Sequence, residues 1–219
     1  MIVAIDGPAG VGKSTVARLL ASRLNYLYLD TGALYRAVAW AALDHGLDPE
    51  NRDAVAALLP KLKIQMEFMN NAPTVRVNGR DITGELRTPV VSTAASIVSA
   101  IPAVRAWLLP VQRQIGEKGS IVAEGRDVGT KVFPGAKVKF FLEADAKVRA
   151  ERRHRELVAA GHAGAIEQTQ SEIAGRDSRD RSRAVAPLVP AEDAQHIDTS
   201  NLSAAEVVDR MMAVIAARL

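Results

Sequence analysis

The chain has 219 residues, of which 48% are apolar and 24% charged, a composition typical of one globular, enzyme-sized domain. It contains no cysteine, which excludes a disulfide framework, a thiolate metal site and a catalytic thiol. The formal charge of +3 is small and aromatic residues make up only 4%, so a nucleic-acid surface with stacking aromatic side chains is not indicated.

No segment approaches the ~20 consecutive apolar residues that a membrane-spanning helix needs. The first apolar run ends after a few residues, at Asp6, so no export signal is indicated. The absence of cysteine agrees with a reducing compartment. We therefore expect a cytoplasmic protein with no membrane partner.

Five short apolar segments are predicted to form buried parallel strands. They are Ile2 to Ile5, Tyr26 to Leu29, Ile121 to Ala123, Val138 to Leu142 and Gln195 to Ile197. Helical patterns separate most of them, and this alternation predicts an α/β layered sheet. Because ligands of such sheets collect at the carboxyl ends of the strands, we expect the functional residues just after each strand.

A phosphate-binding motif follows the first predicted strand. It fits G-x-x-x-x-G-K-[ST] and opens a predicted helix, which is the context that this motif requires. The glycines let backbone amides turn toward phosphate oxygens, and Lys13 adds a positive charge for the β and γ phosphates of ATP. We predict that Ser14 holds Mg²⁺. The predicted ATP-binding residues are Gly7, Pro8, Ala9, Gly10, Val11, Gly12, Lys13, Ser14 and Thr15.

The motif alone does not name a reaction, because switches, motors and kinases share it. A GTPase switch also needs D-x-x-G and a later [NT]-K-x-D. Asp81 to Gly84 fits the first by chance in our interpretation, and Thr130 to Phe133 does not fit the second. Arginines after the second and third predicted strands instead supply the fixed positive charge that phosphoryl transfer requires.

The segment between the second and third predicted strands departs from the strand and helix alternation. Lys63 to Phe68, Thr74 to Val77 and Arg80 to Thr83 have alternating polarity, which is typical of half-buried strands. Turns are predicted at Asn70 to Pro73 and, more strongly, at Asn78-Gly79. We predict a small inserted antiparallel sheet.

Two further segments have a distinct character. The segment from Asp145 to Val185 is dense in arginine and acidic residues. The C-terminal helix begins with a capping box, Ser203 followed by Glu206, and its apolar stripe from Val207 to Ile215 is predicted to pack in the core.

Three stretches together resemble bacterial cytidylate kinases: Asp30 to Arg36, Glu124 to Thr130 and Arg176 to Leu188. The resemblance covers essentially the whole chain. It implies a P-loop NTPase fold with a five-stranded parallel sheet flanked by helices, a small antiparallel insert in the acceptor-binding lobe, and a helical lid. The implied core is 1–30, 98–144 and 186–219, the acceptor lobe is 31–97, and the lid is 145–185.

The resemblance also implies the reaction and the partners. The γ-phosphoryl group of ATP would pass to CMP or dCMP, with Mg²⁺ as cofactor, on a monomer that has no nucleic-acid partner. Lys13, Arg126 and Arg183 are the implied catalytic residues. The implied CMP-binding residues are Thr31, Arg36, Ser96, Arg105, Arg126, Asp127, Arg176, Asp180 and Arg183.

Within this set, the family pattern assigns the acceptor phosphate to Arg36, Arg126 and Arg183, and the ribose to Arg176 and Asp180. The base falls to Ser96, Arg105 and Asp127, with Thr31 beside the acceptor. The lid arginines at 152, 153, 179 and 181 are implied to swing onto the ATP phosphates, and Glu124 is interpreted as part of the Mg²⁺ water shell.

The chemistry of cytosine agrees with the base assignment. Cytosine has an amino donor at N4 and acceptors at N3 and O2, which complement the carboxylate of Asp127 and the guanidinium of Arg105. Uracil reverses the first two positions, and an unpaired buried carboxylate would cost on the order of several kcal/mol.

Two alternatives remain open at the level of sequence. One is a P-loop kinase that acts on another small acceptor such as UMP. The other is a non-catalytic nucleotide switch or a nucleic-acid-binding ATPase that uses the basic segment from Asp145 to Val185. A panel of acceptors separates the first, and salt-dependent binding to RNA or DNA would identify the second.

Overall fold

The protein is described here by a computed structural model that covers residues 1–69, 72–117, 119–162 and 164–218. Its main sheet has five parallel strands in the order β2-β6-β1-β7-β8. The strands are β1 (Ile2–Asp6), β2 (Leu27–Asp30), β6 (Ile121–Gly125), β7 (Val138–Glu143) and β8 (Gln195–Asp198). All five predicted strands are confirmed, and each ends one or two residues later than predicted, because the backbone ladder continues through the polar residues that follow the apolar run.

Eight α-helices accompany the sheet in the described residues. They are α1 (Lys13–Leu24), α2 (Thr31–Asp44), α3 (Arg52–Leu58), α4 (Pro89–Val98), α5 (Pro102–Gly116), α6 (Ala146–Ala159), α7 (Ile166–Ser182) and α8 (Ala204–Ala216). Two 3-10 turns, η1 (Leu59–Lys61) and η2 (Thr83–Glu85), and one π-helical turn, η3 (Val128–Val132), complete the elements. None of these described helices is by itself long and apolar enough to span a membrane; α4 and α5 pass that test only as a pair, and they are bent by 102°.

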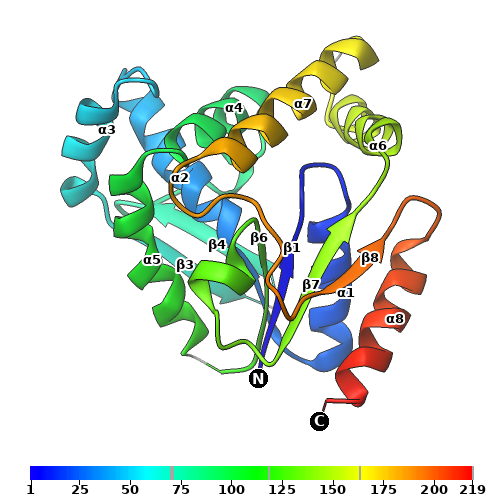
Figure 1. Ribbon diagram of the computed structural model, residues 1–219. Helices are drawn as coiled ribbons and strands as arrows, with labels where there is room; N and C mark the ends of the chain where they lie inside the picture. The colour runs from blue at the N-terminus through cyan, green and yellow to red at the C-terminus, as the bar shows by residue number, and fades with distance from the viewer. Residues whose placement is uncertain (70–71, 118, 163, 219) are drawn as a thin grey trace.

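The strands bury side chains on both faces of the main sheet. In β1, Val3 and Ile5 pack with α1 and α8, whereas Ala4 faces the opposite layer that contains α2, α4 and α5. Figure 1 shows these two layers on either side of the strands. The predicted capping box at Ser203 and Glu206 is confirmed at the start of α8, whose buried residues include Val207 and Met211. Both faces are covered, which explains why the strands have continuous apolar sequences.

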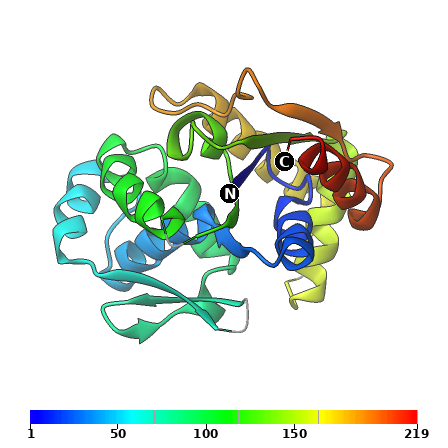
Figure 2. The ribbon, with the colours of Figure 1, turned by 90° about the horizontal axis from the view of Figure 1, so that it is seen from below.

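The inserted sheet is confirmed as antiparallel, with β3 (Ile64–Met69), β4 (Ala72–Val77) and β5 (Arg80–Asp81) in that order. Figure 2 shows it at the side of the molecule away from α8. The Asn78-Gly79 turn is confirmed, with Asn78 at a φ of 50° and Gly79 at 87°. The third strand is shorter than predicted, because the chain turns into η2 at Thr83.

The other predicted turn, Asn70 to Pro73, is wrong in its second half. Asn70 and Asn71 lie outside the described residues, whereas Ala72 and Pro73 belong to β4. Two residues further on, the N–H of Val75 points toward the β5 side and donates to the Thr83 hydroxyl oxygen at 2.9 Å. The backbone nitrogen of Pro73 is directed to the same side of β4. Because β5 pairs only with Arg76 and Val77, there is no strand beside Pro73 to which an N–H could donate.

The charged segment forms the two packed helices α6 and α7, so the helical structure predicted for it is confirmed. Figure 1 shows them beyond the carboxyl ends of β1 and β7, on the side where the loops after the strands gather. The fold therefore collects the phosphate motif, the loops after β2 and β6, and the charged helices at one end of the sheet.

The layer between the sheet, α1 and α8 offers a test of this packing. Leu20 of α1 is fully buried, whereas its neighbour Leu19 is only partly buried. We expect Leu20→Ala to lower the free energy of unfolding by about 2–5 kcal/mol, because the cavity cannot collapse between a helix and a sheet. Leu19→Ala is the matched control and should cost less. Urea unfolding measures both, and equal losses would contradict this packing.

Candidate active site

The phosphate loop between β1 and α1 is held in a compact conformation. Gly7 has a φ of 149°, and a Cβ there would come 2.3 Å from the carbonyl oxygen of Leu142 in β7, so only glycine fits. Lys13 is buried, and its Nζ donates to the carbonyl oxygen of Pro8 at 2.6 Å. The lysine is thus folded back over the loop, at the N-terminus of α1, where the helix dipole favours anions.

Lys13 carries an electrostatic penalty in this state. Burial and the neighbouring Arg126 lower its pKa to about 7, although Glu124 and Asp6 act in the opposite direction. A buried ammonium is costly even beside these two carboxylates, and a bound phosphate would add a further anion. The loop therefore has the electrostatic character of a phosphate site.

Beyond the phosphate loop, five buried or nearly buried side chains form a chain of alternating charge. Arg105 of α5 pairs with Asp127, which follows β6. Arg183, at the end of α7, lies 3.4 Å from the other oxygen of Asp127 and 3.5 Å from Asp180. Arg126 completes the chain, and its Nε donates to Asp180 at 2.8 Å. The order is Arg105, Asp127, Arg183, Asp180 and Arg126, which leaves an excess of positive charge.

Arg176 adds to this excess. Burial and the adjacent Arg126 lower its pKa to about 10, and its Nε is buried without a hydrogen bond in the described residues. The carboxylate of Asp180 is stabilised in turn: burial opposes its ionisation, but Arg126, Arg176 and Arg183 hold its pKa below the usual value. Such a concentration of guanidinium groups suits a polyanionic ligand.

A second group of charges lies at the start of α2. Asp30 ends β2 and caps α2 by accepting from the Ala33 N–H at 3.1 Å. Its other oxygen accepts from Arg36 at 2.6 Å and from Arg87 at 3.1 Å. Burial opposes its ionisation, yet these two arginines lower the pKa of Asp30. The Nε of Arg36 is buried without a partner in the part of the chain described, so its guanidinium retains donor capacity.

Two of the predicted base and acceptor residues are hydroxyls. Ser96 of α4 is buried and accepts from Arg179 Nε at 3.1 Å, so it is not the helix-surface hydroxyl that a lone serine in a helix often is. Thr31 donates to the carbonyl oxygen of Glu124 at 2.8 Å, which ties the start of α2 to the end of β6.

The residues around Lys13 also fit a divalent cation. Ser14 is the second residue of α1, and the buried carboxylate of Glu124 at the end of β6 interacts electrostatically with Lys13. One oxygen of Glu124 accepts from the Tyr28 hydroxyl at 2.6 Å, which fixes the orientation of the carboxylate. A hydroxyl and an oriented carboxylate beside a phosphate loop are oxygen ligands of the kind that Mg²⁺ prefers.

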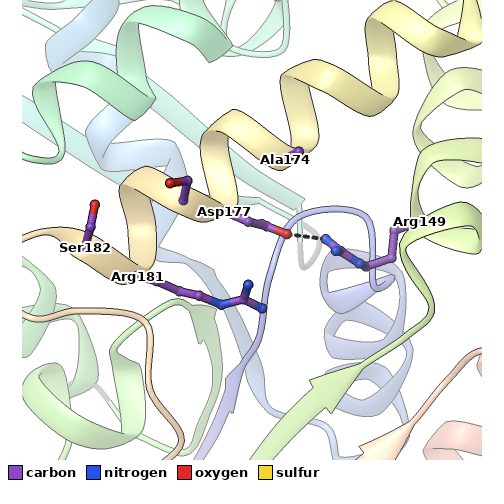
Figure 3. Close-up of a pocket in the computed structure, with 6 residues that line it drawn as sticks. Arg149, Ala174, Asp177, Arg181 and Ser182 are labelled. Atoms are coloured by element: carbon purple, nitrogen blue, oxygen red, sulfur yellow. Dashed lines mark hydrogen bonds and ion pairs between the residues drawn. The ribbon is translucent and has the colours of Figure 1, made fainter.

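The charged helices contact the phosphate loop directly. Asp177 of α7 accepts from the Ala9 N–H at 3.1 Å, and Arg149 of α6 donates to the Ala9 carbonyl oxygen at 2.9 Å. Figure 3 shows the Arg149 and Asp177 pair beside this loop, with Arg181 pointing from α7 to the same side. These residues line a pocket together with Ala174, Ser178 and Ser182. Helices α6 and α7 are therefore docked on the phosphate loop.

The four lid arginines occupy different environments. Arg152 donates to the carbonyl oxygen of Thr199 at 2.7 Å and so holds the loop after β8. Arg153 pairs with Glu156 at 3.2 Å on its own helix, and Arg179 is bonded to Ser96. Arg181 is exposed and lines the pocket. Of the four, Arg181 is therefore the one directed toward the space beside the phosphate loop.

Comparisons with known proteins agree with this geometry. The family model described as cytidylate kinase matches residues 3–217. A cytidylate kinase from Syntrophotalea carbinolica is 47% identical over 218 residues, which cover 100% of this chain and 93% of the relative. A bifunctional pantoate ligase/cytidylate kinase from a Synechococcus strain is 50% identical over 212 residues, and the match spans 96% of this chain but only 43% of that protein.

The chain belongs to the cytidylate kinase family. It is accordingly an ATP-dependent nucleoside monophosphate kinase, as the sequence predicted. An uncharacterized protein from Eubacterium ventriosum, of known structure, superimposes with a TM-score of 0.57 at 13% identity, covering 100% of this chain and 99% of the other. At that identity the likeness concerns the fold alone.

Sequence reasoning missed several residues that organise the site of this kinase. These are Asp30, Asp177 and Arg149. They lie inside the predicted segments, but their positions in the sequence do not indicate the residues with which they form ion pairs. Asp177 and Arg149 have partners far away in the chain, such as Ala9 for both, which the sequence could not indicate. The signal that could have found Asp30 is its place directly after a strand and before a helix, which is typical of a cap.

The lowered pKa of Lys13 makes a prediction about ATP binding. Phosphate oxygens should raise this pKa again, so at about pH 8, where the phosphates of ATP are ionised, we expect uptake of about one proton per ATP bound. ATP affinity should therefore fall as the pH rises above about 7. Calorimetric titration in two buffers of different ionisation enthalpy measures the uptake.

The control for this titration is Lys13→Arg. A guanidinium stays charged throughout this range, so the variant should bind ATP with no proton uptake. If the wild-type kinase takes up no proton, or if the arginine variant takes up as much, Lys13 is not the group that titrates.

Proposed function

We propose that this kinase transfers the γ-phosphoryl group of ATP to CMP and dCMP, with the cytosine ring selected by Asp127 and Arg105. The observation that carries the proposal is the buried charge chain in which Asp127 lies between Arg105 and Arg183. In this chain, Asp127, which suits the edge of a base, is connected to arginines that suit a phosphate. The identity of nearly half of all residues with a full-length cytidylate kinase supports the same acceptor.

The acceptor phosphate would be held by Arg36, Arg126 and Arg183. A nucleoside monophosphate carries about −1.5 to −2 charges near neutral pH, and guanidinium forks match its oxygens bidentately. Without acceptor, these arginines lie against Asp30, Asp180 and Asp127. The aspartates keep the cations in place and buried, and the surplus positive charge favours the incoming dianion.

The base would be read by the ion pair of Asp127 and Arg105, with Ser96 beside it. The carboxylate accepts from the N4 amino group of cytosine, and the guanidinium donates to its acceptors. Both side chains are at least 90% buried, so a uracil that offers a carbonyl to Asp127 would set two acceptor oxygens against each other, and the uracil carbonyl would gain no hydrogen bond there, at high cost. Cytosine is therefore preferred over uracil.

The ribose would lie against Arg176 and Asp180. A hydrogen bond to the 2′-hydroxyl contributes about 1 kcal/mol, so its loss leaves the deoxynucleotide usable as a substrate. Thr31, which the Glu124 carbonyl holds in place, would line the acceptor site.

At the donor side, the loop from Gly7 to Thr15 would bind the ATP phosphates, and Lys13 would lie on the β and γ phosphates. Ser14 would hold Mg²⁺, with Glu124 in the shell of water around it; when bound, this ion neutralises charge that develops on the phosphate oxygens. The protein's own contribution is positioning and electrostatic stabilisation by Lys13, Arg126 and Arg183, because in-line transfer between aligned phosphates needs no protein nucleophile.

The division of labour along the chain follows. The core of residues 1–30, 98–144 and 186–219 would fix the phosphate loop, the lobe 31–97 would carry the acceptor, and the lid 145–185 would close over ATP and exclude water, with Arg181 nearest to the donor phosphates. We propose a monomer that acts in the cytoplasm on free nucleotides.

A panel of acceptors tests the function. The purified kinase with ATP and Mg²⁺ should form ADP fastest with CMP and dCMP, much more slowly with UMP, and hardly at all with AMP, dTMP or no acceptor. Coupled ADP detection gives kcat/KM for each. If turnover were fastest with a different nucleotide, the kinase would stand and the roles proposed for Ser96, Arg105 and Asp127 would be wrong.

Asp127→Asn tests the base assignment. The amide keeps the shape but can present an amino group to uracil, so we expect the preference for CMP over UMP in kcat/KM to fall by about 10–100-fold, the value of a hydrogen bond to a charged group. The control is Asp209→Asn on α8, which removes an exposed carboxylate paired with Arg23 of α1. If Asp127→Asn kept the wild-type preference for CMP over UMP, Asp127 would not be the residue that selects the base.

A further inference from the structure

The last residue of β1 is a buried carboxylate with no role so far. Asp6 is only 4% exposed and directly precedes the phosphate loop. Its Oδ1 accepts from the Val128 N–H at 2.8 Å, and its Oδ2 accepts from the Gly129 N–H at 2.7 Å. Both oxygens of the carboxylate are thus engaged by two consecutive amides of a segment more than 120 residues further along the chain.

These two amides begin η3, the turn that follows Asp127. The first N–H groups of a helical turn have no carbonyl partner within the turn. Later amides of the turn do have one: Lys131 and Val132 both donate to the Asp127 carbonyl oxygen, at 2.8 and 3.2 Å. The backbone of Asp127 is therefore held by the turn on one side and, through Val128 and Gly129, by Asp6 on the other.

The strand register brings the two segments together. Asp6 is paired with Gly125 in the ladder between β1 and β6, so the turn starts just beyond the last paired residues. Arg126 and Asp127 lie between this pair and the amides that Asp6 accepts. A single carboxylate therefore links the strand that leads into the phosphate loop to the two side chains proposed for the acceptor.

The contact with Asp6 leaves little room for a side chain at Gly129. A Cβ at Gly129 would lie 3.3 Å from Asp6 Oδ2 and 3.2 Å from the Cδ of Lys139, tighter than an ordinary contact. Burial raises the pKa of Asp6 to about 6 against the two backbone hydrogen bonds, which lower it. The carboxylate is costly to bury, and in return it satisfies two amides that would otherwise lack partners.

We propose that Asp6 is a positioning residue for the acceptor: by accepting from Val128 and Gly129 it fixes Arg126 and Asp127 relative to the phosphate loop, and so sets acceptor affinity and base selectivity. The inference rests on the roles proposed above for Arg126 and Asp127. Asp6 itself touches neither substrate.

Asp6→Asn is the direct test. One oxygen remains to accept one amide, but the NH₂ group faces the other N–H and repels it. We expect the KM for CMP to rise about tenfold or more and the preference for CMP over UMP to fall, while the KM for ATP changes less than about threefold. Hydrogen exchange of the Val128 and Gly129 amides, measured without substrates, should become faster in the same variant.

Met211→Ala is the matched control, because it destabilises the fully buried packing of α8 far from the acceptor. If it changes the KM for CMP as much as Asp6→Asn does, the effect is one of stability and the proposal is overturned. The proposal is equally overturned if the amides of Asp6→Asn lose protection while the KM for CMP and the base preference stay at wild-type values.

Gly129→Ala changes the same contact on the side of the turn. It replaces Asp6→Asn as the test if that variant does not fold. Its methyl group should push the turn away from Asp6 and change the same constants in the same direction, by a smaller factor. Unchanged constants would contradict the proposal. If the wild type prefers another acceptor, the proposed function fails, but the same comparison of acceptor KM with ATP KM still decides the role of Asp6.

Discussion

The site proposed for the acceptor depends on one constraint: several guanidinium groups have to be held in place largely out of water. The structure meets it by alternating charge, in the order Arg105, Asp127, Arg183, Asp180 and Arg126. Each carboxylate is shared by two arginines, so the cations stay in place while the chain as a whole remains positive. Burying these arginines without carboxylate partners would cost too much free energy for the protein to fold. If every arginine were fully neutralised, no positive charge would remain to attract a phosphate.

Buried positive charge is also found at Lys13 of the phosphate loop and at Arg176 of α7. Lys13 lies against the Pro8 carbonyl with its pKa lowered, and Arg176 has a buried Nε without a partner in the described residues. These groups are in an unfavourable state that an anion would relieve. Because these groups are desolvated by the fold itself, binding of nucleotide phosphates can relieve the cost, which is the electrostatic preorganisation that phosphoryl transfer relies on.

Contacts between distant parts of the chain connect the phosphate loop and its strand to the segments proposed to bind the acceptor and to close over ATP. Asp6 joins the strand before the phosphate loop to the turn after Asp127. Asp177 and Arg149 join the lid helices to Ala9 in the loop itself. A kinase that has to align two phosphates gains from such links, because a displacement of about 1 Å between the two sides would lower the rate of transfer substantially.

The parallel strands, the phosphate loop, the inserted sheet and the family could be predicted from the sequence, because periodicity, turn residues and contiguous motifs are local properties of the chain. Motifs also pointed to Arg36, Asp127 and Asp180. The pairing of the charges could not be predicted: Asp30 pairs with Arg36 and Arg87, Asp127 lies between Arg105 and Arg183, and Asp6 reaches the turn after β6. An ion pair or a distant cap depends on two backbone segments meeting in space, and neither segment encodes the position of the other.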